Sequence, residues 1–355
     1  ACQLANVGLE ILMLDILPQQ AQKDTKNKGL RNSVAQDALN KAIKSKPAPL
    51  YKKEYANRIT VGNFEDDFEK ISEADWIIEV VVERLDIKKQ IFEKVEKYRK
   101  PGSIVSSNTS SIPISQLSEG RSDEFKKHFC GTHFFNPPRY LRLLEIIPIE
   151  ETQLELVNFF MRFGEINLGK QTVLCKDTPA FIANRVGVMS GVKVFDLTQK
   201  YDLSIEEVDA LTSSLIGRPN TGTFRLQDLV GLDTGEKVTQ FVINNVKNDS
   251  FFEFVGKAPD TKFMTFLLEN NFLGNKTGKG FYHKTDQKDQ NGKSIINALD
   301  LKTLEYKPSI RPKNAILKEA KAIENMGKRM SFLIGKEDKE SLFLNISSKP
   351  APNRC

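Results

Sequence analysis

Cysteine and histidine are scarce in this sequence, and their scarcity narrows the chemistry that the chain can perform. The 355 residues contain four cysteines and three histidines, and no two cysteines form a Cys-X-X-Cys pair. This spacing argues against a disulfide framework and against a cysteine zinc site. No His-Glu-X-X-His sequence is present either, so we expect no metal. Widely separated cysteines are typical of a reducing compartment, and we therefore expect a cytoplasmic protein.

Long apolar runs and targeting signals are also missing. Charged residues interrupt every apolar stretch well before the ~20 residues that a membrane-spanning helix needs, so we expect no membrane span. The sequence opens on Ala1-Cys2-Gln3, without a basic and apolar leader and without an initiator methionine. We therefore expect no targeting signal, and we expect the sequence to be truncated at its start.

Apolar material is nevertheless sufficient for packed cores. Hydrophobic residues make up 39% of the chain and 23 residues are phenylalanine, a composition that excludes disorder over the whole length. At roughly 100–200 residues a domain, this length fits two domains and part of a third.

The positive charge is concentrated in one segment. The net charge of the whole chain is +6, whereas residues 21–60 contain ten basic and three acidic residues. Apolar residues recur at helical spacing from Leu30 to Ile43, which predicts an amphipathic helix whose polar face either meets an anion or is simply solvated. No aromatic residue interleaves with these lysines before Tyr51, which argues against a nucleic-acid partner.

Short apolar runs alternate with helical periodicity in the first half of the chain. The runs that we expect to be strands are residues 10–15, 58–61, 76–82, 103–106, 129–135 and 143–147. Helical spacing occupies residues 86–98 and 153–163. Strands that alternate with helices favour parallel pairing, so we predict a doubly wound α/β sheet of the Rossmann type.

The pattern becomes mainly helical after residue 175. Residues 179–199 are expected to form one long helix with a proline near its start, and Ser204 with Glu207 predicts a capping box for the next helix. We therefore predict an α/β domain over residues 1–176 and an all-helical domain over residues 177–283. Residues 284–355 are expected to be a linker, polar and irregular to about Ser309, and the start of a truncated distal region. Phenylalanines of the helical part, namely residues 251, 252, 254, 263 and 266, are expected to pack in a core or a dimer interface.

Asp15 lies at the end of the first predicted strand. In dinucleotide-binding α/β units, an acid about 20 residues beyond a glycine-rich loop binds the adenine ribose and excludes a 2′-phosphate. Counting back from Asp15 places that loop before Ala1, so we expect the loop and the strand that precedes it to be absent from this chain. An acid at a strand end is also often a helix cap.

His133 and Glu145 are candidates for acid-base chemistry. Histidine titrates near neutral pH, and a carboxylate partner fixes its tautomer and stabilises the imidazolium. Two adjacent strands could bring these residues together, since both lie in predicted strands. The alternative is that His133 has a structural role, with its ring nitrogens hydrogen-bonded within the fold.

Several segments taken together resemble, in order and spacing, the L-3-hydroxyacyl-CoA dehydrogenase family. They are residues 79–83, 107–111, 131–137, 143–145 and 177–185, and residues 276–282 are similar to the closing segment of that family. The resemblance covers roughly residues 1–283. Residues 46–49 and 132–149 further resemble the bacterial fatty-acid-oxidation proteins that join this dehydrogenase to an enoyl-CoA hydratase.

The resemblance implies the reaction and the residues that perform it. The reaction would be NAD-dependent oxidation of an L-3-hydroxyacyl-CoA to the 3-oxoacyl-CoA in fatty-acid β-oxidation. His133 would take the proton of the substrate 3-hydroxyl, and Glu145 would orient the histidine. Ser110 and Asn184 would hydrogen-bond the reacting oxygen and the surroundings of the histidine.

The resemblance also implies the binding residues and partners. Asp15 would hold the ribose of NAD, and Glu83, Lys88 and Asn108 would line the nicotinamide side. Lys44 and Lys46 are candidates for the phosphates of CoA. The partners would be an acyl-CoA substrate and either a second copy of the chain or further domains of the same chain.

Structural roles remain open for these residues when each is taken alone. Residues 107–111 could form a polar turn, Glu83 could be an acid at a helix start, and Lys88 could be a solvated lysine. The alternative function is a non-catalytic acyl-CoA-binding or dimerisation fragment, because the glycine-rich loop that binds pyrophosphate is missing.

Overall fold

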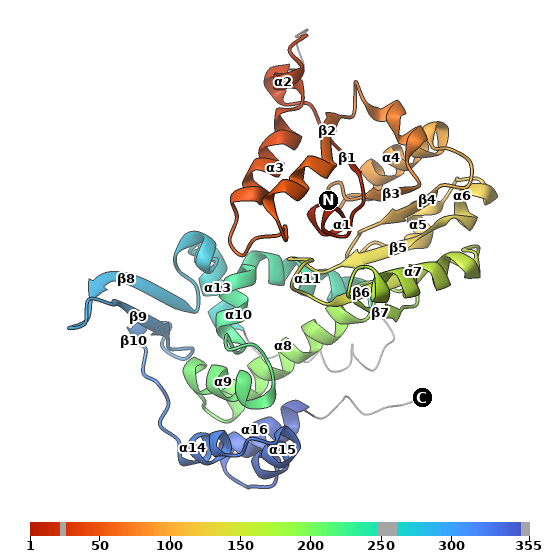
Figure 1. The fold of residues 1–355 in the computed structure, drawn as a ribbon. Coiled ribbons are helices and arrows are strands. Elements are labelled where there is room, and N and C mark those ends of the chain that lie inside the picture. Colours follow the sequence, from red (N-terminus) through yellow and green to blue (C-terminus); the bar gives the residue numbers. More distant parts are fainter. Residues whose placement is uncertain (22–25, 247–260, 349–355) are drawn as a thin grey trace. The chain divides into compact units, whose positions relative to one another are not determined.

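The computed structural model describes residues 1–21, 26–246 and 261–348 and divides into two compact units (Figure 1). Unit 1 is Ala1–Ile182 and unit 2 is Ala183–Cys355. The division lies six residues beyond the boundary expected after residue 176, and the division into three parts stays a prediction. Among the described helices, none is both long and apolar enough to cross a bilayer.

The described strands of unit 1 form two sheets. β1 (Ile11–Asp15) pairs in parallel with β2 (Ile59–Asn63). The second sheet has the order β3 (Trp76–Glu79), β4 (Ile104–Ser107), β5 (Phe129–Phe134), β6 (Leu143–Pro148) and β7 (Gln171–Leu174). Its pairings are parallel except for β5 with β6, which is antiparallel. The predicted Rossmann-type fold class is confirmed, with a mixed rather than an all-parallel sheet.

Helices pack against both sheets of unit 1. The described helices are α1 (Cys2–Asn6), α2 (Lys28–Arg31), α3 (Ser33–Lys44), α4 (Leu85–Tyr98), α5 (Ile114–Ser118), α6 (Asp123–Lys127) and α7 (Leu154–Ile166). The basic helix α3 buries Ala35 and Leu39 and lies beside β1 and β2 (Figure 1). α4 buries Phe92, whose ring lies 5.0 Å from the ring of Phe129 on β5. Apolar residues at helical spacing therefore cover the sheets, as the periodicity predicted.

A buried polar contact joins the three parallel strands β3, β4 and β5. The indole Nε1 of Trp76 donates to Ser106 Oγ at 2.9 Å, and Thr132 Oγ1 donates to the same oxygen at 2.8 Å. The Trp76 ring also packs on Phe160 of α7, with ring centroids 4.9 Å apart. These contacts tie β3, β4 and β5 together and pack the sheet against α7.

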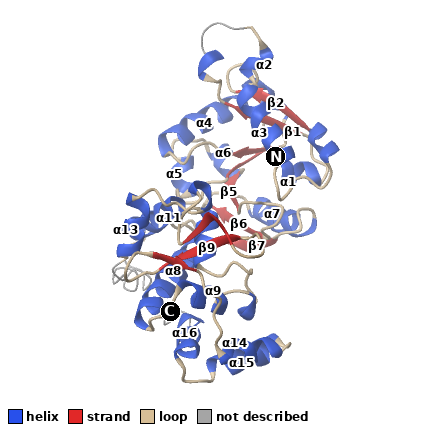
Figure 2. Ribbon diagram, turned by 90° about the vertical axis from the view of Figure 1, so that its left-hand side faces the viewer, coloured by secondary structure: helices blue, strands red, loops and turns tan. Residues whose placement is uncertain are grey.

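Unit 2 is mainly helical, as expected. Its described helices are α8 (Ala183–Lys200), α9 (Ile205–Leu211), α10 (Phe224–Val230), α11 (Leu232–Asn245), α13 (Lys262–Glu269), α14 (Ala315–Ala322), α15 (Met326–Ile334) and α16 (Lys339–Ser348). The last three lie together in Figure 2. The predicted capping box of Ser204 and Glu207 is present at the start of α9. Phe263 is buried in the core of this unit and Phe266 packs against that core, whereas residues 251–254 lie outside the described residues.

The irregular structure expected of residues 284–309 is wrong. β8 (Tyr282–Lys288), β9 (Ser294–Leu299) and β10 (Tyr306–Pro308) form an antiparallel sheet in the order β10-β9-β8. The polar run that suggested a linker is the turn of a hairpin, in which Asp289 accepts from the N–H groups of Asn291 and Lys293 and Gly292 has a φ of +75°. Because most of β8 is exposed beyond its first residues, its composition resembles that of a loop.

The long helix of unit 2 begins later than the sequence predicts. α8 starts at Ala183 rather than at Pro179 because Ala180 and Phe181 have φ values of +61° and +50°. A non-glycine residue rarely adopts this left-handed conformation. Here it turns the buried Phe181 side chain against His133, with ring centroids 5.7 Å apart.

Two buried aspartates hold the closing segment of the resemblance in unit 2. Asp228 accepts from the N–H groups of Phe281 and Tyr282, each at 2.8 Å, and burial raises the pKa of its carboxyl group to about 6. Asp209 accepts from the Tyr282 hydroxyl at 2.7 Å. A Cβ atom at Gly280 would lie 2.1 Å from Asp228 Oδ1, so the close approach requires glycine there.

Candidate active site

His133 and Glu145 face each other across two paired strands. In the antiparallel register of β5 and β6 they are direct partners, and residues in that relation have neighbouring side chains on one face of the sheet. His133 Nδ1 lies 2.7 Å from Glu145 Oε2. His133 is 5% exposed and Glu145 is fully buried. The structure thus brings together the pair that the sequence singled out.

The Glu145 carboxylate is held by more than the histidine. Its Oε1 accepts from the N–H of Ile182 at 3.1 Å. Burial, together with the charge of Glu145 and a hydrogen bond to it, raises the pKa of the Cys175 thiol to about 12. A buried carboxylate is tolerated only when such partners satisfy it, and Cys175 consequently stays a thiol.

The imidazole of His133 is fixed in orientation. Its ring packs against Phe135 at 4.4 Å and Phe181 at 5.7 Å between centroids. Because Nδ1 faces the carboxylate, the neutral form of the ring carries its proton on Nδ1 and leaves its electron pair on Nε2. The arrangement can therefore accept a proton at Nε2.

Glu83 organises the loop that follows β4. Its Oε1 accepts from Thr109 Oγ1 at 2.6 Å, from the N–H groups of Ser110 and Ser111 at 3.0 and 3.1 Å, and from Ser111 Oγ at 2.8 Å. Burial opposes the negative charge, but the hydrogen bonds from Thr109 and Ser111 and the charge of Lys88 together lower the pKa of Glu83. The carboxylate therefore remains ionised and fixes residues 109–111.

Lys88 lies beneath Glu83 rather than at the surface. Its side chain is 1% exposed, and Nζ contacts Glu79 Oε1 at 2.8 Å, the carbonyl of Val81 at 3.2 Å and Glu83 Oε2 at 3.3 Å. An ammonium group has three hydrogens to donate. These three contacts occupy them, so Lys88 can act on a ligand only through Glu83.

Glu79 is a residue of this network to which the sequence assigned no role. It is buried at the end of β3, and Oε2 accepts from Ser107 Oγ at 2.5 Å. Its backbone carbonyl accepts from the N–H of Asn108 at 2.9 Å, and Asn108 Oδ1 accepts from the N–H of Phe134 at 2.9 Å. An acid that ends an apolar strand, as in Trp76-Ile-Ile-Glu79, was the available signal.

The residues beyond the strands fit a dinucleotide. Ligands of open α/β sheets bind at the carboxyl ends of the strands. Asp15 ends β1, half-buried, with its Oδ1 accepting from the N–H of Ile16 at 2.7 Å. Val80 and Val82, which lie between the end of β3 and Glu83, are 68% and 60% exposed. An acid at one strand end and exposed apolar side chains at another suit a ribose and the faces of flat rings.

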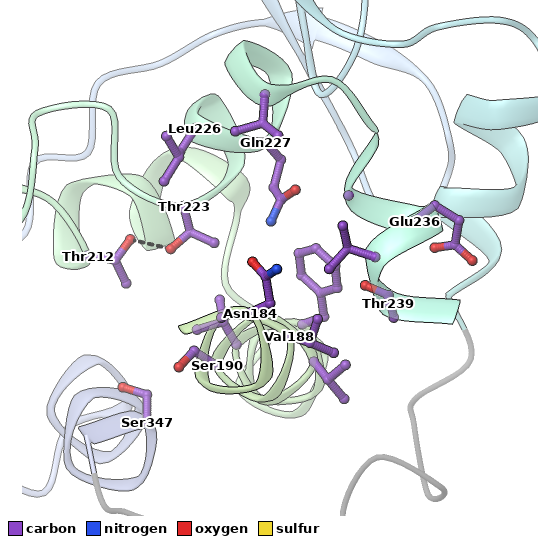
Figure 3. A pocket seen from close by; sticks show the side chains of 18 of the residues that line it. Asn184, Val188, Ser190, Thr212, Thr223, Leu226, Gln227, Glu236, Thr239 and Ser347 are labelled. Atoms are coloured by element: carbon purple, nitrogen blue, oxygen red, sulfur yellow. Dashed lines mark hydrogen bonds between the residues drawn. The ribbon is translucent and has the colours of Figure 1, made fainter. Parts of the chain in front are cut away.

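The remaining predicted residues lie farther from this cluster in the chain. Lys44 ends α3, and Lys46 follows it; both side chains are exposed. Asn184 belongs to unit 2, where it lines a cavity of about 740 Å³ together with residues of α8, α10, α11 and α13. Figure 3 shows the amides of Asn184 and Gln227 pointing into this cavity from α8 and α10. Within the described residues, no group of three or more His, Cys, Asp or Glu side chains could hold a metal ion.

The buried network around Lys88 should contribute to the stability of unit 1. Lys88→Met would leave two carboxylates without their counter-ion, and we expect the free energy of unfolding to fall by about 3–5 kcal/mol. Lys89→Met is the matched control, because Lys89 pairs with Glu119 at the surface and its loss should cost less than about 1 kcal/mol. Urea unfolding followed by the fluorescence of Trp76, the single tryptophan, measures both variants. Equal losses in the two variants would contradict the buried network.

Family models match both units. One, described as "3-hydroxyacyl-CoA dehydrogenase, NAD binding domain", matches residues 1–178. Another, described as "3-hydroxyacyl-CoA dehydrogenase, C-terminal domain", matches residues 181–284.

Curated relatives have similar names. A probable 3-hydroxyacyl-CoA dehydrogenase of Bacillus subtilis is 45% identical over 357 residues, which cover 98% of this chain and 44% of the relative. A probable 3-hydroxyacyl-CoA dehydrogenase of Deinococcus radiodurans is 41% identical over 292 residues, which cover 80% of this chain and 79% of the relative. This chain thus spans less than half the length of the Bacillus protein.

Solved structures agree with the family models. The (S)-3-hydroxybutyryl-CoA dehydrogenase of Ralstonia eutropha has a TM-score of 0.58 and 28% identity, covering 78% of this chain and 91% of that one. FadB2 of M. tuberculosis has a TM-score of 0.62 at 24% identity, covering 80% of this chain and 93% of that one, and it shows the fold alone. The chain therefore belongs to the 3-hydroxyacyl-CoA dehydrogenase family, with an NAD-binding domain followed by the C-terminal domain of that family.

Proposed function

We propose that this chain oxidises an L-3-hydroxyacyl-CoA to the 3-oxoacyl-CoA in fatty-acid β-oxidation, with NAD as the hydride acceptor. The observation that carries the proposal is the buried His133–Glu145 pair, with 2.7 Å between Nδ1 and Oε2. A histidine oriented in this way is a suitable general base for an alcohol. The family supplies the substrate class and the cofactor.

In the proposed reaction, His133 Nε2 removes the proton of the substrate 3-hydroxyl. Bound NAD supplies the acceptor for the hydride that leaves C3. The imidazolium that forms is stabilised by Glu145, whose other oxygen is held by the N–H of Ile182 and cannot swing away without losing that bond. Ser110 and Asn184 are the residues that the family resemblance assigns to hydrogen bonds with the reacting oxygen and the surroundings of the histidine.

The binding roles follow the same proposal. Asp15 would accept from the ribose hydroxyls of NAD, and Glu83 and Asn108 would shape the nicotinamide side. Lys88 would contribute by fixing Glu83, since its three donors are occupied. Lys44 and Lys46 would meet the phosphates of CoA. The cavity that Asn184 lines includes Val188, Leu226, Val230, Val238, Ile243 and Met264, and such apolar walls would suit an acyl chain.

Partners and location complete the proposal. An acyl-CoA is the substrate, and a second copy of the chain or further domains of a longer chain would cover unit 2. The described cysteines, including buried Cys130 and Cys175, are free thiols, which supports a reducing compartment such as the cytoplasm.

Replacing the proposed base tests the mechanism. His133→Gln should keep the fold, shown by an unchanged urea midpoint, and lower kcat for a 3-hydroxyacyl-CoA by about 10²–10⁴-fold. Steady-state NADH formation measures this loss. His128→Gln is the matched control, because His128 directly follows α6 and its ring bonds the Glu124 carbonyl rather than Glu145. Its turnover should match that of the unmodified chain. Retained turnover in His133→Gln would remove the proposed base.

A second candidate function is a non-catalytic acyl-CoA-binding or dimerisation fragment. The observation that favours it is the separation of the two sheets of unit 1: Asp15 ends a strand of one sheet, while Glu83 follows a strand of the other. A nucleotide would have to bridge the strand ends of both sheets. The affinity for NADH therefore separates the two functions.

Titration with NADH and NADPH measures that affinity. We expect saturable NADH binding at micromolar concentration and much weaker NADPH binding, because the Asp15 carboxylate repels a 2′-phosphate. Asp15→Asn should bring the two affinities closer together, while Glu10→Gln, at the opposite end of β1, should leave their ratio unchanged. If NADH does not bind while an acyl-CoA binds measurably, the second candidate is favoured.

A further inference from the structure

Residues 46–51, which we call the Lys46 loop, are held in place by side chains from elsewhere in unit 1. The loop lies between α3 and the next helical turn and belongs to no helix or strand. Pro47 and Pro49 have no N–H to donate. The backbone groups are satisfied instead by side chains, since Asn6 Nδ2 donates to the carbonyl of Pro49 at 2.9 Å and Asn6 Oδ1 accepts from the N–H of Tyr51 at 2.8 Å.

Arg139 provides the main contacts to the Lys46 loop. Its Nη1 donates to the carbonyls of Ala48 and Leu50, each at 2.7 Å, and the hydroxyl of Tyr140 donates to the Ala48 carbonyl at 2.8 Å. The guanidinium also packs on the rings of Tyr51 and Tyr140, 4.7 and 5.3 Å from their centroids. Its contacts are therefore those of a tether between two loops.

The segment that carries Arg139 is itself anchored to the strand of the proposed base. This segment, residues 135–142, begins directly after β5, and Arg139 is six residues beyond His133. Lys170, which is 6% exposed, donates Nζ hydrogen bonds to the carbonyls of Pro138 and Leu141. Residues 138–141 are thus fixed from within the unit by Lys170, and they in turn fix the Lys46 loop through Arg139.

We propose that Arg139 is a positioning residue for acyl-CoA, holding Lys46 at a set distance from His133 so that the nucleotide phosphates and the thioester bind at once. This inference rests on the proposed function and adds to it the residue that links the two ends of the substrate. Ordering a loop costs conformational entropy at the moment of binding. A loop that Arg139 has already ordered avoids that cost, so contacts to the remote nucleotide can contribute to the affinity.

The test compares two thioesters by calorimetric titration: acetoacetyl-CoA and acetoacetyl-pantetheine, which lacks the nucleotide. Arg139→Ala should lower the affinity for acetoacetyl-CoA at least tenfold and leave that for acetoacetyl-pantetheine unchanged. kcat at saturating substrate should also be unchanged, because His133 and Glu145 are untouched. Arg139→Lys should behave like Arg139→Ala, because a lysine lacks the planar guanidinium that packs on the rings of Tyr51 and Tyr140.

Arg142→Ala is the matched control. It removes the same charge three residues along, from an exposed side chain, and both affinities should remain those of the unmodified chain. An equal loss in Arg142→Ala would show that charge alone acts, and a retained affinity in Arg139→Lys would show that the planar guanidinium is not needed. Either result would overturn the positioning role.

A double-variant cycle with Lys46→Ala separates positioning from direct contact. If Arg139 acts through Lys46, Arg139→Ala should lower the affinity for acetoacetyl-CoA less than twofold in the Lys46→Ala background. If the affinity losses of the two single variants instead multiply in the double variant, Arg139 contacts the ligand directly and the proposal is overturned. If the unmodified chain and Arg139→Ala favour acetoacetyl-CoA over acetoacetyl-pantetheine to the same degree, only this proposal is overturned. An unmodified chain that binds neither thioester contradicts the proposed function as well.

Discussion

The burial of one carboxylate, Glu145, is the constraint on which the candidate site depends. An ionised group away from water must be surrounded by donors, and here they include His133 Nδ1 and the N–H of Ile182. Satisfying Glu145 therefore fixes the tautomer of the histidine. It also fixes the strand register, because a slip of one residue between β5 and β6 would turn the two side chains to opposite faces.

A second buried charge network supports the same edge of the sheet. β3, β4 and β5 are parallel and adjacent, so their carboxyl ends lie together. Lys88 neutralises Glu79 and contacts Glu83, and Glu83 in turn orders residues 109–111. The proposed base near the end of β5 and the proposed cofactor residues beyond β3 and β4 are thus organised by two carboxylate networks, each complete within unit 1.

Much of this arrangement could be predicted from the sequence because it depends on local patterns. Apolar runs marked the strands of unit 1, and the order of motifs pointed to His133 and Glu145. The hairpin of β8 and β9 was missed because exposed strands have the composition of loops. The burial of Lys88 and the contacts of Arg139 could not be predicted, since each depends on residues brought together only by the fold, such as Ala48 and Leu50.

Nuclear magnetic resonance of the chain labelled with ¹⁵N-histidine tests the central claim most directly. The account predicts that His133 carries a proton on Nδ1, with a strongly downfield proton resonance that moves upfield in Glu145→Gln. A proton on Nε2, with Nδ1 unprotonated, would contradict the account, because the nitrogen proposed to accept the substrate proton would then have no free electron pair.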